Sequence, residues 1–206
     1  WKPDTWLEIL GEFMHLEAKE VDDGGKKLTK ESLIFPRYHQ LHAVHALVSY
    51  SAAEGVGQTY LIQHSAGSGK SNTIAWTAHR MSNLHTAADK KVFDTVIVIT
   101  DRKVLDRQLQ ETISQFEHKA GVVQTIDTNS EQLAKALNDG APIIVTTIQK
   151  FPYVIDKVGA MSGKSFALII DEAHSSQSGA AARKLRSALT KTASPKSVLA
   201  VQLDGE

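Results

Sequence analysis

Apolar and polar positions follow two different patterns along this chain. From about residue 59 onward, short runs rich in valine and isoleucine are separated by stretches with helical spacing. The runs contain little alternation of apolar and polar residues, which is typical of strands that are covered on both faces. We expect strands over residues 59–63, 95–100, 122–126, 143–147, 166–170 and 197–203.

Helical spacing between these runs predicts the connecting elements. The expected helices cover residues 70–84, 104–118, 131–138 and 180–189. A strand, a helix and a second strand in succession form a βαβ unit with a right-handed crossover, so the sheet is expected to be mostly parallel. The predicted fold class is therefore α/β, with helices covering the sheet.

The first part of the chain has a helical pattern followed by a charged break. Its apolar spacing predicts an amphipathic helix over residues 5–21, and the charged stretch 22–30, with its two glycines, is interpreted as a linker. The spaced positions include Trp6, Leu10, Phe13 and Glu17. A second helical pattern covers residues 37–53. We expect a helical lead-in over residues 1–32 and one α/β domain over 33–206.

Composition narrows the classes of protein. Of the 206 residues, 42% are hydrophobic, which is enough for one core. The 23 basic and 23 acidic residues give a formal net charge of zero, which excludes a polycationic nucleic-acid tail and an acidic disordered segment. Because cysteine is absent, disulfides and thiolate metal sites are excluded, and we expect a reducing, cytoplasmic setting.

Membrane and export signals are missing from the sequence. No run reaches the roughly 18 to 20 apolar residues that span a bilayer, so we expect no membrane association. The start has neither a signal-peptide pattern nor an initiator methionine. We interpret the chain as a fragment of a longer protein.

The strongest chemical signal joins the 59–63 strand to the helix that follows it. Residues 64–71 read His-Ser-Ala-Gly-Ser-Gly-Lys-Ser, which is typical of a phosphate-binding loop between a strand and a helix. Gly67 and Gly69 let backbone N–H groups curl around phosphate oxygens, and the helix N-terminus adds partial positive charge. Lys70 is placed to reach the β- and γ-phosphates, and Ser71 to ligate Mg²⁺. The expected phosphate contacts are Ser65, Ala66, Gly67, Ser68, Gly69, Lys70 and Ser71.

One position departs from the motif. The full pattern has glycine six residues before the lysine, where this chain has His64. His64 closes the preceding strand and does not need to face phosphate, so the departure weakens the match only slightly. A glycine- and serine-rich turn without a ligand is the structural alternative.

A second signal follows a later apolar strand. The run that begins at Phe166 ends in Asp171 and Glu172, with His174 close behind. Ligands bind at the carboxyl edge of the sheet in open α/β folds. There Asp171 would hold Mg²⁺, Glu172 would polarise the water that attacks the γ-phosphate, and His174 would sense the phosphate. Alternatively, Asp171 and Glu172 only cap a helix.

Together these motifs carry a resemblance. Asp-Glu-Ala-His after an apolar strand, with Ser-Gly-Lys-Ser upstream, resembles the first RecA-like lobe of a superfamily 2 helicase or translocase. Over about residues 33–180 the chain resembles the motor (R) subunit of type I restriction enzymes. The segments that carry this resemblance are 35–40, 63–71, 98–102, 146–151 and 171–177. It implies a RecA-like, three-layer α/β/α sandwich and an ATP-dependent hydrolase of the helicase type, with ATP and Mg²⁺ as cofactors.

The resemblance also implies how the base is bound. Gln40 matches the glutamine that reads the adenine edge, a role that suits an amide with its donor and acceptor atoms. Arg37 and Tyr38 are its neighbours and are placed to contact or stack on the base. Without the resemblance, Gln40 would be interpreted as a solvated helix residue.

Residues that follow two of the strands match segments that contact the DNA backbone in these motors. Hydroxyls, N-terminal amides and cations grip phosphates without reading base sequence. A solvated polar loop is the alternative for each residue. The implied contacts are Thr100, Arg102, Lys103, Thr146, Thr147 and Lys150.

Two further patterns are interpreted as coincidences. His39, His42 and His45 recur every third residue, but helical geometry spreads them around the helix and no carboxylate completes a metal site. Glu17-Ala18-Lys19 is similar to the Glu-x-Lys of restriction nucleases, in which the triplet ends an apolar strand, whereas here it falls on the predicted helix. The lead-in is therefore interpreted as the joint between a nuclease and the motor.

The implied function is ATP-driven movement along double-stranded DNA within a type I restriction complex. The implied partners are a second RecA-like lobe and a nuclease domain in the parent chain, and separate modification and specificity subunits. Because the second lobe supplies an arginine finger, we expect this fragment alone to bind ATP–Mg²⁺ weakly and to hydrolyse it slowly or not at all. The alternatives are a P-loop kinase-like enzyme and a nucleotide-gated adaptor without hydrolysis; the intact Glu172 argues against the adaptor.

Overall fold

The structure is a computed structural model of the whole chain. It describes residues 2–24, 26–65, 67–100, 103–116, 121–126, 130–147, 163–171 and 198–205. Statements about structure below refer to these residues.

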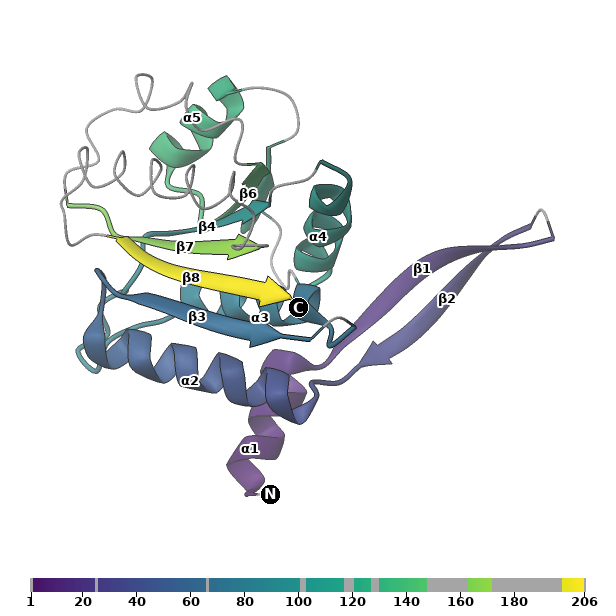
Figure 1. The fold of residues 1–206 in the computed structure, drawn as a ribbon, viewed down its shortest axis with the longest axis horizontal. Helices are drawn as coiled ribbons and strands as arrows, with labels where there is room; N and C mark the ends of the chain where they lie inside the picture. The colour runs from purple at the N-terminus through teal and green to yellow at the C-terminus, as the bar shows by residue number, and fades with distance from the viewer. Residues whose placement is uncertain are drawn as a thin grey trace.

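A six-stranded parallel sheet forms the centre of the molecule (Figure 1). Its strand order is β3-β8-β7-β4-β6-β5, and every neighbouring pair is parallel. The strands are β3 (Thr59–His64), β4 (Thr95–Thr100), β5 (Val123–Thr125), β6 (Ile143–Thr147), β7 (Phe166–Asp171) and β8 (Val198–Gly205). Parallel pairing of strands that follow one another through helices confirms the predicted βαβ organisation.

Helices cover both faces of the sheet. They are α2 (Tyr38–Glu54), α3 (Lys70–Ser82), α4 (Lys103–Gln115) and α5 (Ser130–Asp139). Helices α2 and α3 lie on one face and α5 on the other (Figure 1). Alternate residues of β4 lie in two different clusters of buried apolar residues. Val96 and Val98 pack with α2, α3 and α4, while Ile97 packs with α5. The predicted three-layer α/β/α sandwich is confirmed.

The strand that leads into the phosphate loop differs from the central strands. Every residue of β4, β6 and β7 is buried, as expected for apolar strands covered on both faces. Strand β3 lies at the edge of the sheet and alternates between exposed and partly buried positions, with Leu61 59% exposed. The expectation that all the strands are covered on both faces is therefore wrong for β3.

The predicted element boundaries are close to those observed. Strands β4 and β6 have the predicted limits, whereas β5 is shorter than the predicted 122–126. Helix α3 ends two residues earlier than predicted, at Ser82. The helix predicted over 180–189 lies outside the described residues.

The N-terminal segment is where the prediction fails. A short helix α1 (Pro3–Glu8) continues as a π-helical turn η1 (Ile9–Phe13), and then the chain forms an antiparallel hairpin. The hairpin strands are β1 (His15–Asp23) and β2 (Lys26–Ile34). The predicted helix over 5–21 is thus wrong after Phe13, and the predicted linker over 22–30 is the end of one strand, a turn and the start of the next.

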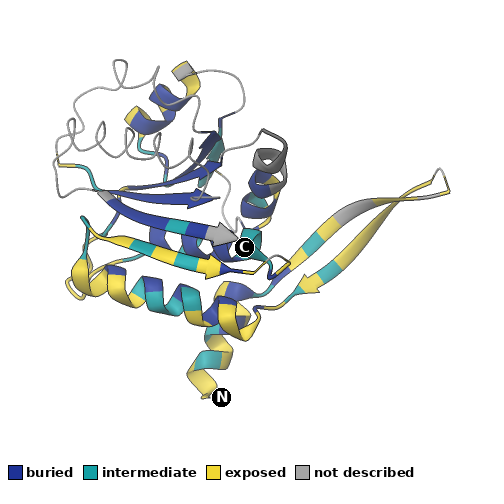
Figure 2. Ribbon diagram, in the orientation of Figure 1, coloured by how far each residue is buried: buried dark blue, intermediate teal, exposed yellow. Residues whose placement is uncertain are grey.

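The first half of this segment and the base of the hairpin pack against the core. At that base His15 is buried and its ring contacts Phe116, with centroids 3.6 Å apart. Ile9 and Phe13 are fully buried in the same cluster as α3, and the Trp76 indole N–H donates to the Phe13 carbonyl at 2.9 Å. Arg80 of α3 pairs with Glu8 at 2.8 Å and with Glu12 at 3.3 Å. Beyond this base, the hairpin projects away from the body and is mostly exposed (Figures 1 and 2).

No helix within the described part of the chain has the length and apolar character that crossing a membrane requires.

Candidate nucleotide site

The phosphate loop lies between the end of β3 and the start of α3, as the sequence predicts. Two of its glycines have the left-handed backbone conformation, with φ of 74° at Gly67 and 84° at Gly69. Side chains with a Cβ rarely adopt these angles, so glycine permits the turn here. Gly69 is the N-cap of α3, and its carbonyl accepts the first backbone bonds of the helix, from Asn72 at 3.1 Å and Thr73 at 3.3 Å.

The start of α3 suits an anion. Lys70 and Ser71 are the first two residues of this 13-residue helix. The first N–H groups of a helix have no partner within it, and the helix dipole places partial positive charge there. Lys70 adds a full charge at the same point. Both loop residues predicted to contact phosphate and metal are therefore at a helix N-terminus.

The two motifs that are far apart in the sequence meet in the structure. Lys70 Nζ lies 3.2 Å from Asp171 Oδ1, at the carboxyl end of β7. The Asp171 residue is only 8% exposed, so this pair is protected from bulk water. An ion pair in such a setting is screened less by salt than a surface pair. The structure thus brings Asp171 and the loop lysine together, and what they bind stays a prediction.

The first turn of α2 binds three successive carbonyls of the loop. The Arg37 guanidinium donates to the Gly67 carbonyl at 3.3 Å. His39 Nε2 lies 3.2 Å from the Ser68 carbonyl, which can only accept, so the ring donates from Nε2. The Gln40 amide donates to the Gly69 carbonyl at 2.9 Å and to that of Ser68 at 3.3 Å.

These contacts orient the peptide groups of the loop. In a trans peptide the carbonyl and the following N–H point in opposite directions, and this chain has no cis peptide among its described residues. Because the Ser68 and Gly69 carbonyls face α2, the N–H groups of Gly69 and Lys70 point away from it. Backbone donors are thereby directed away from α2, as binding of phosphate oxygens by the loop would require.

Gln40 lies inside this site and is only 3% exposed. Its Oε1 accepts from the Arg37 N–H at 2.8 Å, while its amide nitrogen is bound to the loop. A Cβ at Gly69 would lie 2.6 Å from Gln40 Nε2, so the two residues fit closely. The alternative of a solvated helix residue is wrong, and adenine recognition by Gln40 stays a prediction.

Tyr38, by contrast, is 76% exposed. Its ring stacks on His42 with centroids 6.0 Å apart. The other face of such a ring is open, which is compatible with the predicted stacking on a base and does not test it.

His64 ends β3 as predicted, but it also contacts the loop. Its residue is 5% exposed, and Nδ1 lies 3.1 Å from Ser68 Oγ. Burial lowers the pKa of His64 below its usual value, and the nearby His39 and Lys70 lower it further. The ring is therefore neutral at neutral pH. Neither His39 nor His64 was predicted to contact Ser68, because sequence spacing does not reveal a contact between α2, β3 and the loop.

The three regularly spaced histidines make different contacts. His39 binds the loop, His42 stacks on Tyr38, and His45 lies 3.0 Å from a Glu8 carboxylate oxygen. Among the residues that the structure describes, no group of three histidines or carboxylates is placed to hold a metal ion.

The helical argument against a nuclease triplet has to be corrected. Glu17, Ala18 and Lys19 lie in β1, not on a helix. They sit in the middle of the hairpin, where Glu17 is opposite Ser32. In the described part of the chain, β2 is the only strand that pairs with β1. The triplet thus lies on an isolated two-stranded hairpin.

The predicted DNA contacts fall into two groups. Thr100 ends β4 and lies opposite Thr147 of β6, with Thr146 beside it. All three threonines are buried, and no hydrogen-bond partner for their hydroxyls is found among the described residues. Lys103 begins α4. The positions Arg102 and Lys150 lie outside the described residues, as do Ala66, Glu172 and His174 of the nucleotide site.

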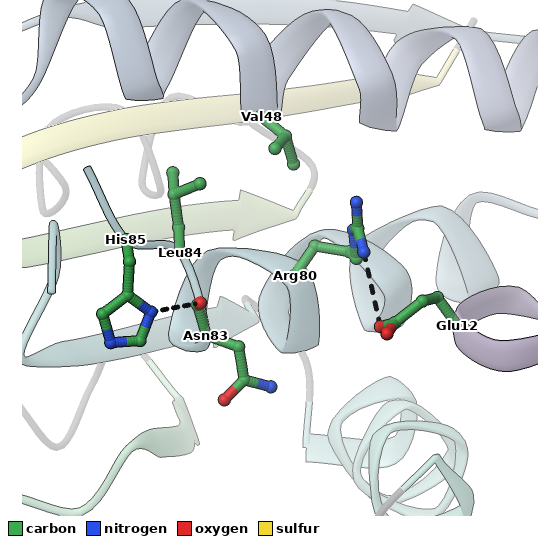
Figure 3. Close-up of a pocket in the computed structure, with 6 residues that line it drawn as sticks. All are labelled: Glu12, Val48, Arg80, Asn83, Leu84 and His85. Atoms are coloured by element: carbon green, nitrogen blue, oxygen red, sulfur yellow. Dashed lines mark hydrogen bonds and ion pairs between the residues drawn. The ribbon is translucent and has the colours of Figure 1, made fainter. Parts of the chain in front are cut away.

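A separate cavity lies at the other end of α3 (Figure 3). It has a volume of about 330 Å³ and is lined by Glu12, Val48, Arg80, Asn83, Leu84 and His85. Arg80 points toward Glu12, so its charge is already paired (Figure 3). This cavity is not part of the phosphate loop, which lies at the N-terminal end of the same helix.

Comparison with known families places the loop in context. The family model described as the SWI2/SNF2 ATPase matches residues 39–194. This range contains the phosphate loop and both motif carboxylates.

Curated relatives are type I restriction enzyme subunits. The endonuclease subunit of the SsaAORF53P enzyme from Staphylococcus saprophyticus is 36% identical over 156 residues, which are 73% of this chain and 16% of that protein. The SauCOLORF180P subunit from Staphylococcus aureus is 35% identical over the same shares of the two chains. The HindI subunit from Haemophilus influenzae is 27% identical over 86% of this chain and 17% of its own length. These matches confirm the predicted resemblance, and the chain spans about a sixth of these relatives.

Solved helicases share the fold. The UvsW helicase from bacteriophage T4 matches with a TM-score of 0.54 and 18% identity, over 97% of this chain and 58% of that one. A hypothetical ATP-dependent RNA helicase from Sulfolobus tokodaii matches with a TM-score of 0.55 and 18% identity, over 82% of this chain and 46% of that one. At this identity the likeness shows the RecA-like fold alone.

Proposed function

Because the chain belongs to the SWI2/SNF2 ATPase family, we propose that it is the ATP-binding lobe of a motor that moves along double-stranded DNA in a type I restriction complex. The proposed partners are a second RecA-like lobe and a nuclease domain in the parent chain, together with modification and specificity subunits. The proposed location is the cytoplasm. The names of the curated relatives support this assembly.

The observation that carries the proposal is the 3.2 Å pair between Lys70 and Asp171. It joins the phosphate loop to the end of β7, a strand separated from β3 by β8. A glycine-rich turn without a ligand, or a carboxylate that only caps a helix, would not require this meeting. In P-loop NTPases the loop lysine and the carboxylate that holds Mg²⁺ both act at the triphosphate, so a nucleoside-triphosphate site accounts for the pair.

The residues present suit a magnesium ion. Ser71 supplies a hydroxyl oxygen and Asp171 a buried carboxylate, and Mg²⁺ prefers oxygen ligands. We assign Ser71 and Asp171 as its ligands, with Asp171 holding it directly or through water. When bound, the ion neutralises charge on the β- and γ-phosphates.

The chain's own groups would divide the remaining work. The loop from Ser65 to Ser71 would bind phosphate oxygens through backbone N–H groups, and Lys70 would leave Asp171 to pair with the γ-phosphate. Glu172 would accept a proton from the attacking water, and His174 would respond to the phosphate. The second lobe would add an arginine finger, worth about 10³- to 10⁵-fold in rate.

The base and the DNA would be bound at neighbouring positions. Gln40, Arg37 and Tyr38 would contact the adenine, which requires at least part of the Gln40 amide to exchange its loop contacts. The proposed DNA contacts are Thr100, Arg102, Lys103, Thr146, Thr147 and Lys150. Because the three threonines are buried, their hydroxyls would have to become accessible before they could contact a DNA backbone.

The test uses the full-length protein with its partner subunits and a linear DNA duplex. ATP hydrolysis is measured with and without DNA, and translocation by displacement of a third strand bound to the duplex. Lys70→Ala is expected to abolish both activities. Glu172→Gln is expected to retain ATP binding and to lose about 10²- to 10⁴-fold in hydrolysis, as for removal of a general base.

Two exposed positions provide matched controls. Lys90→Ala and Glu111→Gln make the same chemical changes away from the loop and should leave both activities unchanged. Equal ATPase rates for the Glu172→Gln variant and the unmodified protein would exclude the motor and favour a nucleotide-gated adaptor. ATP hydrolysis without any strand displacement would retain the ATPase and reject translocation.

A further inference from the structure

Ser68 is held by two histidines from different elements. Its hydroxyl lies 3.1 Å from His64 Nδ1, and its carbonyl lies 3.2 Å from His39 Nε2. The two rings meet edge to face, with centroids 5.5 Å apart. Ser68 itself is buried. The middle of the phosphate loop is therefore fixed on both its side chain and its backbone.

Burial of His64 is unfavourable for the stability of the folded protein unless the contact between His64 and Ser68 compensates for it. Its Nε2 is buried and has no hydrogen-bond partner within the described part of the chain. A buried polar atom without a partner destabilises the folded state. The usual glycine at this position of the motif would avoid that cost. Its contact with Ser68 gives the ring a specific role in the loop.

The contact acts on the peptide that faces the proposed phosphate. With the Ser68 carbonyl turned toward α2, the following Gly69 N–H points away from α2. Gly69 has no Cβ to restrict this peptide and can adopt other angles. Fixing the Ser68 hydroxyl and carbonyl therefore limits how far the peptide can rotate before a ligand arrives.

We propose that His64 is a positioning residue for nucleotide binding, which holds the Ser68 hydroxyl while His39 holds the Ser68 carbonyl, so that the Gly69 N–H is directed at phosphate in the free protein. The inference rests on the proposed nucleotide site. It adds a role for residue 64, where the motif has glycine and this chain has histidine. Preorganised donors bind more tightly because less ordering is needed on binding.

The test measures binding of ADP with Mg²⁺ to the full-length protein by calorimetry, so that hydrolysis does not interfere. His64→Gly restores the usual motif and His64→Ala leaves the Ser68 hydroxyl unpaired. Both are expected to weaken binding about tenfold, the effect of one lost hydrogen bond in a buried site. His64→Asn places an amide near the position of Nδ1 and should stay within about threefold of the unmodified protein.

A double-mutant cycle separates positioning from a general structural effect. If His64 acts through the serine, Ser68→Ala should weaken binding by a similar factor, and His64→Ala combined with Ser68→Ala should add little further loss. Thermal melts establish that each variant is folded at the assay temperature. His85→Ala, at the far end of α3, is the control and should bind ADP normally.

Each outcome has a defined meaning. Normal ADP binding by His64→Gly, or fully additive losses in the cycle, would overturn the role of His64 and leave the nucleotide site intact. Loss in His64→Ala without rescue by His64→Asn would also overturn it. Absence of ADP binding by the unmodified protein would overturn both this inference and the proposed nucleotide site.

Discussion

The two ends of α3 are held by different kinds of interaction. At its N-terminal end, Lys70 and the loop are surrounded by polar contacts from α2, β3 and β7. Farther along, Trp76 packs against Phe13, and Arg80 binds two carboxylates of the N-terminal segment. One end thus presents groups that a ligand can engage, whereas the rest of the helix is held by apolar packing and by ion pairs with the N-terminal segment.

This difference suggests a division of labour along one helix. Polar contacts can be exchanged for contacts with a ligand at modest net change in free energy, because hydrogen bonds replace hydrogen bonds. Apolar burial cannot be exchanged in this way, since its loss leaves a cavity. We therefore expect substitutions at the buried end to affect mainly stability and those at the loop to affect mainly binding.

The largest effect is expected at the buried end. Phe13→Ala removes a fully buried ring that contacts Trp76 and should lower the free energy of unfolding by about 3–5 kcal/mol. Leu10→Ala, on the same segment but 54% exposed, should change it by less than about 0.5 kcal/mol. Denaturant unfolding followed by tryptophan fluorescence measures both. Equal effects of the two substitutions would mean that the N-terminal segment is not part of the core.

A smaller effect is expected at the loop. Gly69→Ala combines a left-handed backbone with a Cβ placed 2.6 Å from Gln40 Nε2, so it should displace the Gln40 amide. Gly67→Ala has a similar φ but nothing within 4 Å of the added Cβ. Backbone strain should cost each variant about 1–2 kcal/mol. Gly69→Ala should lose about 1 kcal/mol more, together with most of its ADP affinity. Similar stability and affinity in the two variants would show that the Gln40 contact is unimportant.

The smallest effect concerns pH. Burial lowers the pKa of His64, so the unfolded chain takes up a proton at a higher pH than the folded protein does. The stability that the folded protein gains by keeping this ring neutral is complete above about pH 6.5, the usual histidine pKa. It is lost as the pH falls below that value. The free energy of unfolding, measured between about pH 7.5 and about pH 5.5, should therefore fall more steeply with decreasing pH for the unmodified protein than for His64→Asn. Parallel curves would contradict a buried, neutral ring.

The central sheet was predictable because its strands are short, continuous apolar runs. Strand β6 has no polar residue before its final threonines, and β4 has four consecutive apolar residues between Thr95 and Thr100. Glycines and charged stretches separate these strands from the helices. The phosphate loop was predictable for a different reason, since a lysine after two spaced glycines has few structural explanations other than anion binding.

The hairpin was missed because two patterns overlap. Apolar residues from Trp6 to Phe13 have helical spacing, and the next residues continue it by chance through Glu17. Two nine-residue strands around Gly24-Gly25 were the signal for a hairpin, since a two-glycine turn between such runs is typical of one. The strands are weakly alternating and mostly exposed, so their own pattern gave little support.

The contacts within the site depend on tertiary packing. Gln40 was assigned to the site by its motif, but its bonds to the Ser68 and Gly69 carbonyls arise only when α2 packs beside the loop. The same holds for His39 and His64. The sequence also did not reveal that β3 lies at the edge of the sheet, because the order of the strands depends on crossovers between apolar runs that are distant in the sequence.

Strand β3 has consequences for how the chain acquires its activity. In the described part of the chain its only neighbour is β8, with Thr59 opposite Ala200. Contacts between residues so far apart in sequence form late, because the long intervening loop must close first. Until β8 is in place, β3 and the attached loop lack their pairing partner in the described sheet. The phosphate loop is thus anchored to the sheet through a strand that lies much later in the sequence than the loop itself.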